Sequence, residues 1–326
     1  MRQTSVGRIV TDHKFILFAT FLVLNVIFGL NSSNFFELSN YYNLLKQMAM
    51  IAITGTAATI LMMTGNFDLS TGSTVACTAV LYTLLATHGV PMGAAAVVAV
   101  AAGICIGITN GTLVARVGIP PFIATLGMMY IVRGLGLVAC NGRSIRENIP
   151  SGFSGLARGD FLGIPIPVFL IAGFVLIFWL LEKKSILGKH AMAIGGNRNA
   201  AFFSGIDAAA VVFGLYVAVG ALAAFSGVMM ASRFGAGDPR SGNGFEFDVI
   251  VAILLGGTSL SGGKGSVIGM LLGAMVVAVL GNGLDMLNVL TFWQSVLKGA
   301  ILVAAVILND KILATARKRS VMAVGG

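Results

Sequence analysis

Long apolar runs recur along this chain, and short polar segments separate them. A run of about 20 apolar residues is what an α-helix needs to cross the hydrocarbon core of a bilayer. The composition agrees, because 57% of the residues are hydrophobic and 10% are charged, whereas soluble domains average about 25% charged residues. These values exclude the soluble globular, disordered and collagen-like classes. The sequence therefore predicts an all-α, polytopic membrane protein with a single transmembrane domain over residues 1–326.

The apolar runs predict about ten transmembrane helices. They lie at 15–30, 43–63, 74–87, 93–115, 121–140, 164–181, 208–230, 249–260, 266–284 and 289–308. The polar segment 64–73 separates two of these runs, and it must line a cavity or reach water, since free backbone groups are not tolerated facing lipid. The run 249–260 is too short to cross the bilayer alone. If such broken segments only dip into the membrane, the count falls to about eight or nine.

The basic residues gather at the ends of the spans, which is a topology signal. With ten spans, most of them fall on one side of the membrane: Arg2, Arg8, Lys14, Arg116, Lys183, Lys184, Lys189, Arg198, Lys264, Lys311, Arg317, Lys318 and Arg319. Fewer fall on the other side: Arg143, Arg146, Arg158, Arg233 and Arg240. Lys46, Arg133 and Lys298 lie within or near the ends of spans and are left out of the comparison. The bias predicts cytoplasmic N- and C-termini, and it explains the net charge of +9 without a nucleic-acid partner.

The longest polar interruption on the cytoplasmic side, 182–207, contains a short helix with both ends marked. Asn197 is a good N-cap, because its side-chain oxygen can accept from free N–H groups of the first turn. Residues 198–204 can form about two turns, and Gly205 suits the left-handed residue that ends a helix. Such a short helix must dock on something to be stable, and the pair 202–203 gives it two phenylalanines. The alternative is a helix lying on the lipid headgroups.

The sequence carries no motif for catalysis or nucleotide binding. It has no HExxH, GxSxG or paired CxxC motif, and its three histidines lie near helix ends. The segment 262–266, GGKGS, imitates part of a phosphate-binding loop, but the first glycine and the required spacing are missing. We therefore expect no catalytic residue, no metal and no cofactor in this chain, and no ATP bound to it.

Five stretches in the same order resemble the ribose-type permeases, the membrane subunits of binding-protein-dependent ABC sugar importers. They are TGNFDLSTGS (64–73), NGTLVARVGIPPFIATLGMMYIVRGL (110–135), GKHAMAIGGNRNAAFFSGI (188–206), GFEFDVIVAILLGGTSLSGGKGSVIGMLLGA (244–274) and FWQSVLKGAILVAAVIL (292–308). The first departs from the family at Asn66 and Phe67, where a glycine and an aliphatic residue are usual. The resemblance covers nearly the whole chain.

The resemblance implies a monosaccharide permease in a bacterial inner (plasma) membrane, working by ATP-driven alternating access. Its partners would be an ABC ATPase that holds ATP and Mg, a periplasmic or lipid-anchored sugar-binding protein, membrane lipid, and a second permease copy or a paralogous permease. The loop 182–207 would sit on the ATPase subunit. The residues expected to make that contact are Gly195, Gly196, Asn197, Arg198, Ala200, Phe202, Phe203 and Gly205.

Polar residues near the broken segments and within the spans are candidates for the translocation pathway or for contact with the binding protein. They are Asn66, Asp68, Ser70, Asn110, Thr125, Glu246, Asp248 and Asn282. Asp68 could instead be the N-cap of the third span, and Glu246 and Asp248 could instead complement the dipole of a first helical turn. For the two asparagines and the threonine within spans, the alternative is hydrogen bonding between helices.

A stand-alone, ion-coupled secondary transporter of a small polar solute is the alternative function. Such transporters use buried carboxylates or broken helices to hold the coupling ion, and Asp68 is the acidic residue that we place near an interior break. An intramembrane enzyme would need a nucleophile with its base, or a metal set, and neither is evident. The sequence does not identify the sugar: ribose, another pentose, a hexose or a polyol fits equally well.

Overall fold

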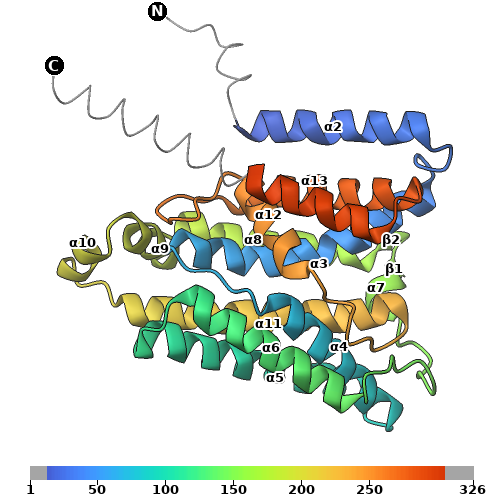
Figure 1. Cartoon of the computed structure of the whole chain (residues 1–326), viewed down its shortest axis with the longest axis horizontal. Coiled ribbons are helices and arrows are strands. Elements are labelled where there is room, and N and C mark those ends of the chain that lie inside the picture. Colours follow the sequence, from blue (N-terminus) through green and yellow to red (C-terminus); the bar gives the residue numbers. More distant parts are fainter. Residues whose placement is uncertain (1–12, 305–326) are drawn as a thin grey trace, which may run out of the picture.

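The computed structural model describes residues 13–304, and it is a bundle of helices that run roughly side by side (Figure 1). Seven helices of this described range are long and apolar enough to cross a membrane. They are α2 (His13–Asn31), α3 (Leu38–Met63), α5 (Met92–Gly111) with its continuation η1 (Thr112–Val117), α6 (Pro121–Ala139), α8 (Ile166–Lys184), α11 (Ala208–Phe234) and α13 (Val267–Met286). The predicted all-α, multi-pass architecture is confirmed.

Two shorter apolar helices correspond to the broken segments of the sequence. α4 (Thr71–Thr87) follows the polar turn 64–70, and α12 (Phe245–Leu255) follows the polar loop 235–244. Residues 71–73 of the predicted polar segment form the first turn of α4, so this helix begins within the segment. Residues 291–304 are also helical, and the end of the predicted span 289–308 lies outside the described residues.

Small elements lie at the two ends of the bundle. At one end, α9 (Ile186–Gly196) and α10 (Arg198–Phe203) follow α8. At the opposite end lie α7 (Gly155–Arg158) and an antiparallel pair of two-residue strands, β1 (Asp160–Phe161) and β2 (Ile164–Pro165) (Figure 1). The sequence predicted loops in both places, and only α10 was predicted as a helix.

Proline marks the start of three spanning helices. Pro91 precedes α5, Pro120 and Pro121 open α6, and Pro165 precedes α8. The first N–H groups of a helix have no intrahelical acceptor, so a proline there removes no hydrogen bond. The positions of these prolines explain why the sequence located the starts of these helices within two residues.

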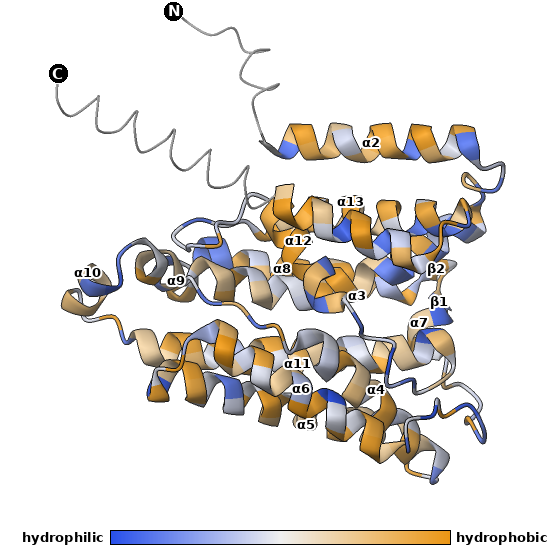
Figure 2. Ribbon diagram, viewed as in Figure 1, coloured by the Kyte–Doolittle hydropathy of each residue, from blue (hydrophilic) through white to orange (hydrophobic). Residues whose placement is uncertain are grey.

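The centre of the bundle is α3, whose residues 48–63 are all buried. It is packed against α8, α11, α12 and α13. Hydroxyl groups are paired inside this core, as between Thr54 Oγ1 and Ser226 Oγ at 2.9 Å. Many exposed apolar side chains instead lie along α2, α5, α6 and α8, and Figure 2 shows apolar residues along the outer helices. These helices form the surface that meets lipid or another membrane subunit.

Glycine allows α5 and α11 to pack backbone against backbone. Gly103, Gly107 and Gly111 lie along one face of α5, and a Cβ atom on Gly107 would lie 2.8 Å from Val217 Cα of α11. Small residues permit this close approach between membrane helices, where van der Waals packing drives association.

We expect Gly107→Val to destabilise the protein by about 1–3 kcal/mol, because the added side chain overpacks the crossing of α5 and α11. The measurement is the thermal unfolding temperature in detergent. Gly127→Val on α6 is the matched control, since a Cβ atom there has no heavy atom within 4 Å. Equal unfolding temperatures for the two variants would contradict the packing argument.

Candidate coupling helix and polar interior

The short helix predicted after residue 197 is present, and both of its ends are formed as expected. The side chain of Asn197 accepts from the backbone N–H of Ala200 at 3.0 Å. α10 then runs from Arg198 to Phe203, and Gly205 adopts φ +79°. The predicted N-cap and the predicted left-handed glycine are confirmed.

α10 stands at the end of the bundle with most of its surface uncovered (Figure 1). Ala201 is buried, whereas Phe202 is 71% exposed and Phe203 is 86% exposed. Arg198 and Phe202 line a hollow between α10 and the start of α11. Two phenylalanines held outward on a capped helix form a surface suited to a protein partner, since aromatic and arginine side chains dominate binding at interfaces.

Helix α9 was not predicted, and it changes the position of one expected contact residue. Gly195 does not face outward: a Cβ atom on it would lie 2.9 Å from Gly262 Cα, and it also meets the Met63 carbonyl. The same carbonyl accepts from the N–H of Gly263 at 2.9 Å. Three backbone segments that are distant in sequence meet here, at residues 63, 195 and 262–263, and we call this contact the glycine junction. Gly196, in contrast, is exposed.

A buried carboxylate links the same region to α13. Glu182, in the last turn of α8, is 1% exposed, and its Oε2 accepts from the backbone N–H of Val267 at 2.7 Å. Its Oε1 lies 2.8 Å from Nζ of Lys183, and the backbone of Gly188 in α9 packs against the Glu182 carbonyl. A carboxylate at the N-terminus of a helix satisfies a free N–H and complements the helix dipole. No motif or spacing in the sequence predicted this contact.

The turn between α3 and α4 holds a polar cluster that includes three expected site residues. Asp68 Oδ1 accepts from the N–H and the hydroxyl of Ser70, at 2.7 and 2.6 Å. Asn110 of α5 donates to Asp68 Oδ2 at 3.2 Å and to Ser70 Oγ at 2.8 Å. Ser70, not Asp68, occupies the N-cap position of α4, and its side chain makes no cap hydrogen bond. The N-cap role expected as the alternative for Asp68 is therefore not the one it has: its carboxylate accepts from the Ser70 N–H.

The rest of this turn is also fixed by hydrogen bonds. Asn66 donates to Oγ1 of Thr64 at 2.8 Å, and Tyr216 of α11 donates its hydroxyl to the carbonyl of Phe67 at 3.0 Å. These contacts satisfy backbone and side-chain groups that would be costly to leave free inside a membrane. Hydrogen bonds from α5 and α11 therefore fix the conformation of the turn.

Two expected pathway residues within spans make other contacts. Asn282 of α13 donates to Asn40 of α3 at 2.9 Å, so it joins two helices. Thr125 is fully buried and donates to the carbonyl of Pro121, four residues earlier in α6. Thr125 therefore forms a hydrogen bond within α6, and this bond is not the interhelical one that was the alternative for this residue.

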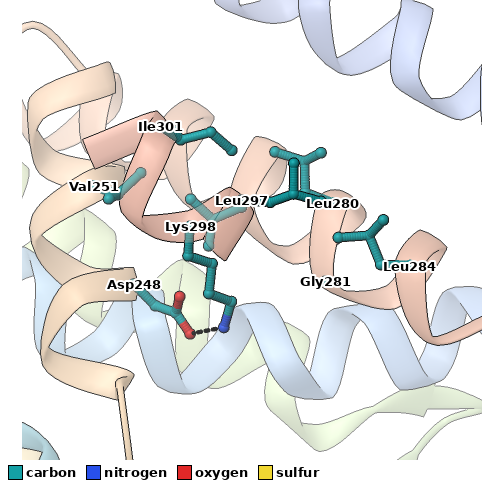
Figure 3. Close-up of a pocket in the computed structure, with 9 residues that line it drawn as sticks. Asp248, Val251, Leu280, Gly281, Leu284, Leu297, Lys298 and Ile301 are labelled. Carbon is teal, nitrogen blue, oxygen red and sulfur yellow. Dashed lines mark hydrogen bonds and ion pairs between the residues drawn. The ribbon is translucent and has the colours of Figure 1, made fainter. Parts of the chain in front are cut away.

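The two acidic residues at the start of α12 have different surroundings. Asp248 forms an ion pair with Lys298 at 2.8 Å, beside a small, largely apolar cavity of about 60 Å³ (Figure 3). Glu246 is 4% exposed and lies against Gly72 of α4. Both belong to the first turn of α12, as the dipole argument expects. Asp248 faces the helix at 291–304, where its carboxylate is paired with Lys298.

Sequence reasoning missed Arg133 of α6. Its Nη1 donates to Oδ1 of Asn243, which precedes α12, and it interacts electrostatically with Glu246. The signal was present, because a charged residue inside an apolar run of a membrane protein is a functional candidate. Arg133 was left out of the topology comparison, and no other role was assigned to it.

The chemistry available to these groups is hydrogen bonding and ion pairing. Within residues 13–304, no group of three or more His, Cys, Asp and Glu side chains is placed to hold a metal ion. Most of the expected site residues thus lie in an exposed helix, a hydrogen-bonded turn and the start of α12, while Thr125, Gly195 and Asn282 lie in helix contacts elsewhere.

Comparison with known proteins gives a consistent result over nearly the whole chain. A family model described as "Branched-chain amino acid transport system / permease component" matches residues 40–306. A ribose import permease of Bacillus subtilis is 37% identical over 295 residues, which are 90% of this chain and 92% of that protein. An L-arabinose ABC transporter permease of Azospirillum brasilense is 37% identical over 89% of this chain and 85% of its own length. A D-allose transport permease of Escherichia coli K12 is 34% identical over 90% of this chain and 92% of its own. No solved structure gives a significant match.

Proposed function

The chain belongs to the family of permease components that includes the ribose import permeases, and we propose that it is the membrane subunit of an ABC importer for a monosaccharide. The family model's description mentions amino acids, but the relatives at 34–37% identity are described as permeases for ribose, L-arabinose and D-allose. A ribose-like pentose or a related sugar or polyol is the proposed substrate.

The observation that carries this proposal is the capped, exposed helix α10. It lies within the proposed coupling loop 182–207 of a single permease domain, and it presents Arg198, Phe202 and Phe203 at one end of the bundle. We propose that this loop docks on an ABC ATPase, which carries the ATP and Mg, and that the permease needs no cofactor of its own. Closure of the ATPase would move α9 and α10 and switch the pathway between its two sides.

The proposed topology has about ten crossing or half-crossing helices and cytoplasmic termini in a bacterial inner membrane. The basic bias of the sequence supports it. In Figure 1, the start of α2 is on the side nearer α9 and α10, and α2 runs toward the end where α7, β1 and β2 lie. That end would face a periplasmic or lipid-anchored sugar-binding protein. A second permease copy, or a paralogous permease, would cover part of the apolar outer surface.

Reconstitution into liposomes tests the proposed function. With the ATPase and the binding protein present, we expect uptake of at least one of D-ribose, L-arabinose and D-allose that requires ATP hydrolysis. With the ATPase omitted, we expect no uptake, even when a proton gradient is imposed. Uptake that persists without the ATPase and follows the proton gradient would refute the proposal and would support the alternative of an ion-coupled secondary transporter.

A further inference from the structure

Polar side chains from α6 and from the start of α12 meet beside the first turn of α4. Arg133 of α6 donates to Asn243. Glu246, in the first turn of α12, lies against Gly72, in the first turn of α4. The N-termini of two short helices therefore converge on Arg133, Asn243 and Glu246, and we call these three residues the crossing cluster.

The crossing cluster has unused hydrogen-bonding groups of both kinds. Nε and Nη2 of Arg133 and Oε2 of Glu246 are buried and have no hydrogen-bond partner in the described structure. The carboxylate of Glu246 is 96% buried, because only 4% of this residue is exposed. Two ion pairs are formed within residues 13–304, Lys183 with Glu182 and Lys298 with Asp248. Arg133 and Glu246 attract each other electrostatically but are too far apart to form an ion pair of this kind. Buried polar groups normally have partners, and charged ones are the most costly to leave open.

The face of α6 that carries Arg133 does not suit lipid. Arg133 lies well inside the span Pro121–Ala139, and an arginine facing hydrocarbon at such a position costs about 2.5–3.5 kcal/mol by insertion scales. Asn243, its hydrogen-bond partner, is exposed. Two polar side chains on one face, one of them charged, indicate that this face borders water or a second subunit.

We propose that the crossing cluster is a contact site for the hydroxyl groups of the transported sugar. This inference rests on the proposed function and assigns residues to its pathway. The open N–H groups of Arg133 would donate to one hydroxyl oxygen, and Oε2 of Glu246 would accept from a neighbouring hydroxyl. A charged donor and a charged acceptor, held apart, match a pair of adjacent sugar hydroxyls, which can both donate and accept. Short helices that end inside the membrane bring such groups to binding sites in many transporters.

The test uses the complete complex of permease, ATPase and binding protein in liposomes. Arg133→Gln and Glu246→Gln remove the charges and keep side chains that can form hydrogen bonds. We expect sugar transported per ATP hydrolysed to fall about tenfold or more, as for the loss of one hydrogen bond to a charged group. Association with the ATPase and the unfolding temperature should stay close to wild type. Arg133→Lys should fall between wild type and Arg133→Gln, because it keeps the charge and loses the planar fork.

Arg116→Gln is the matched control, since Arg116 is an exposed arginine in η1, outside the residues assigned to binding or coupling. Unchanged transport per ATP in both Arg133→Gln and Glu246→Gln would overturn the assignment. A fall in transport that is matched by loss of ATPase association and of thermal stability would also overturn it, because that outcome marks a structural role. If the wild-type complex transports none of D-ribose, L-arabinose and D-allose, the proposed function itself is wrong. The assignment of the crossing cluster to a sugar then fails for that reason.

Discussion

Phe203→Asp is expected to weaken the association of the permease with its ATPase by about 30-fold or more. Phe203 is 86% exposed and stands on a helix with a formed cap, so it is available as an anchor for a partner. A buried aromatic anchor at an interface is worth about 2 kcal/mol or more, and about 1.4 kcal/mol corresponds to a factor of ten in affinity. An aspartate at this position would also have to be desolvated in the complex. ATP-driven uptake should fall with the association.

The measurement is co-purification of the ATPase with tagged permease, followed by uptake in liposomes. Phe161→Asp is the matched control for co-purification alone, because Phe161 is also exposed, at 60%, but lies in β1 at the opposite end of the bundle, which is proposed to face the binding protein. The unfolding temperature should not change in either variant, since neither side chain is part of the core. If the ATPase co-purifies equally with wild type and with Phe203→Asp, α10 is not the docking helix.

Glu182→Ala is expected to separate ATPase binding from transport. The substitution leaves α10 untouched, but it removes the buried acceptor of the Val267 N–H. Leaving a buried donor without a partner costs about 1–3 kcal/mol, and it frees the end of α8 from the start of α13. Coupling between distant sites is typically worth about 1–3 kcal/mol. We therefore expect uptake per ATP hydrolysed to fall about fivefold or more, while the ATPase still co-purifies.

Two neighbouring variants make this experiment specific. Glu182→Gln keeps an oxygen that can accept from Val267 and should retain more transport than Glu182→Ala. Lys183→Ala removes an ion-pair partner whose side chain is 47% exposed, and exposed pairs contribute about 0–1 kcal/mol, so its effect should be small. Normal uptake per ATP in Glu182→Ala, with only a lowered unfolding temperature, would show that Glu182 stabilises the fold and takes no part in coupling.

The sequence predicted those features that depend on short-range physics. Asn197 and Gly205 are recognisable because capping and left-handed turns are properties of single residues in a local context. The break before α4 and the shortness of α12 follow in the same way, because an apolar run either reaches the length of a span or does not. These signals need no knowledge of what packs against them.

The features that the sequence did not predict depend on contacts between distant segments. In the sequence, Glu182 is one of three charged residues that follow the predicted span 164–181. Its contact with the Val267 N–H is visible only in the folded structure. Arg133 meets Asn243 across 110 positions of sequence. Helix α9 was missed because its glycine-rich end suggests a loop, and it is held by the segments that it packs against. Tertiary contacts of this kind override local propensity.

The glycine junction affects how a movement of the proposed coupling loop would be transmitted to the rest of the bundle. Gly195, Gly262 and Gly263 have no side chains, so these three residues meet through main-chain atoms, while Ala191 and Ile194 bury other parts of α9. Flexible side chains at a contact absorb part of a displacement by changing rotamer, and bare peptide groups have no such compliance. We therefore expect a small movement of α9 to reach the end of α3 and the loop before α13 with little loss at this contact. A small displacement of the coupling loop would then be enough to move both of these segments.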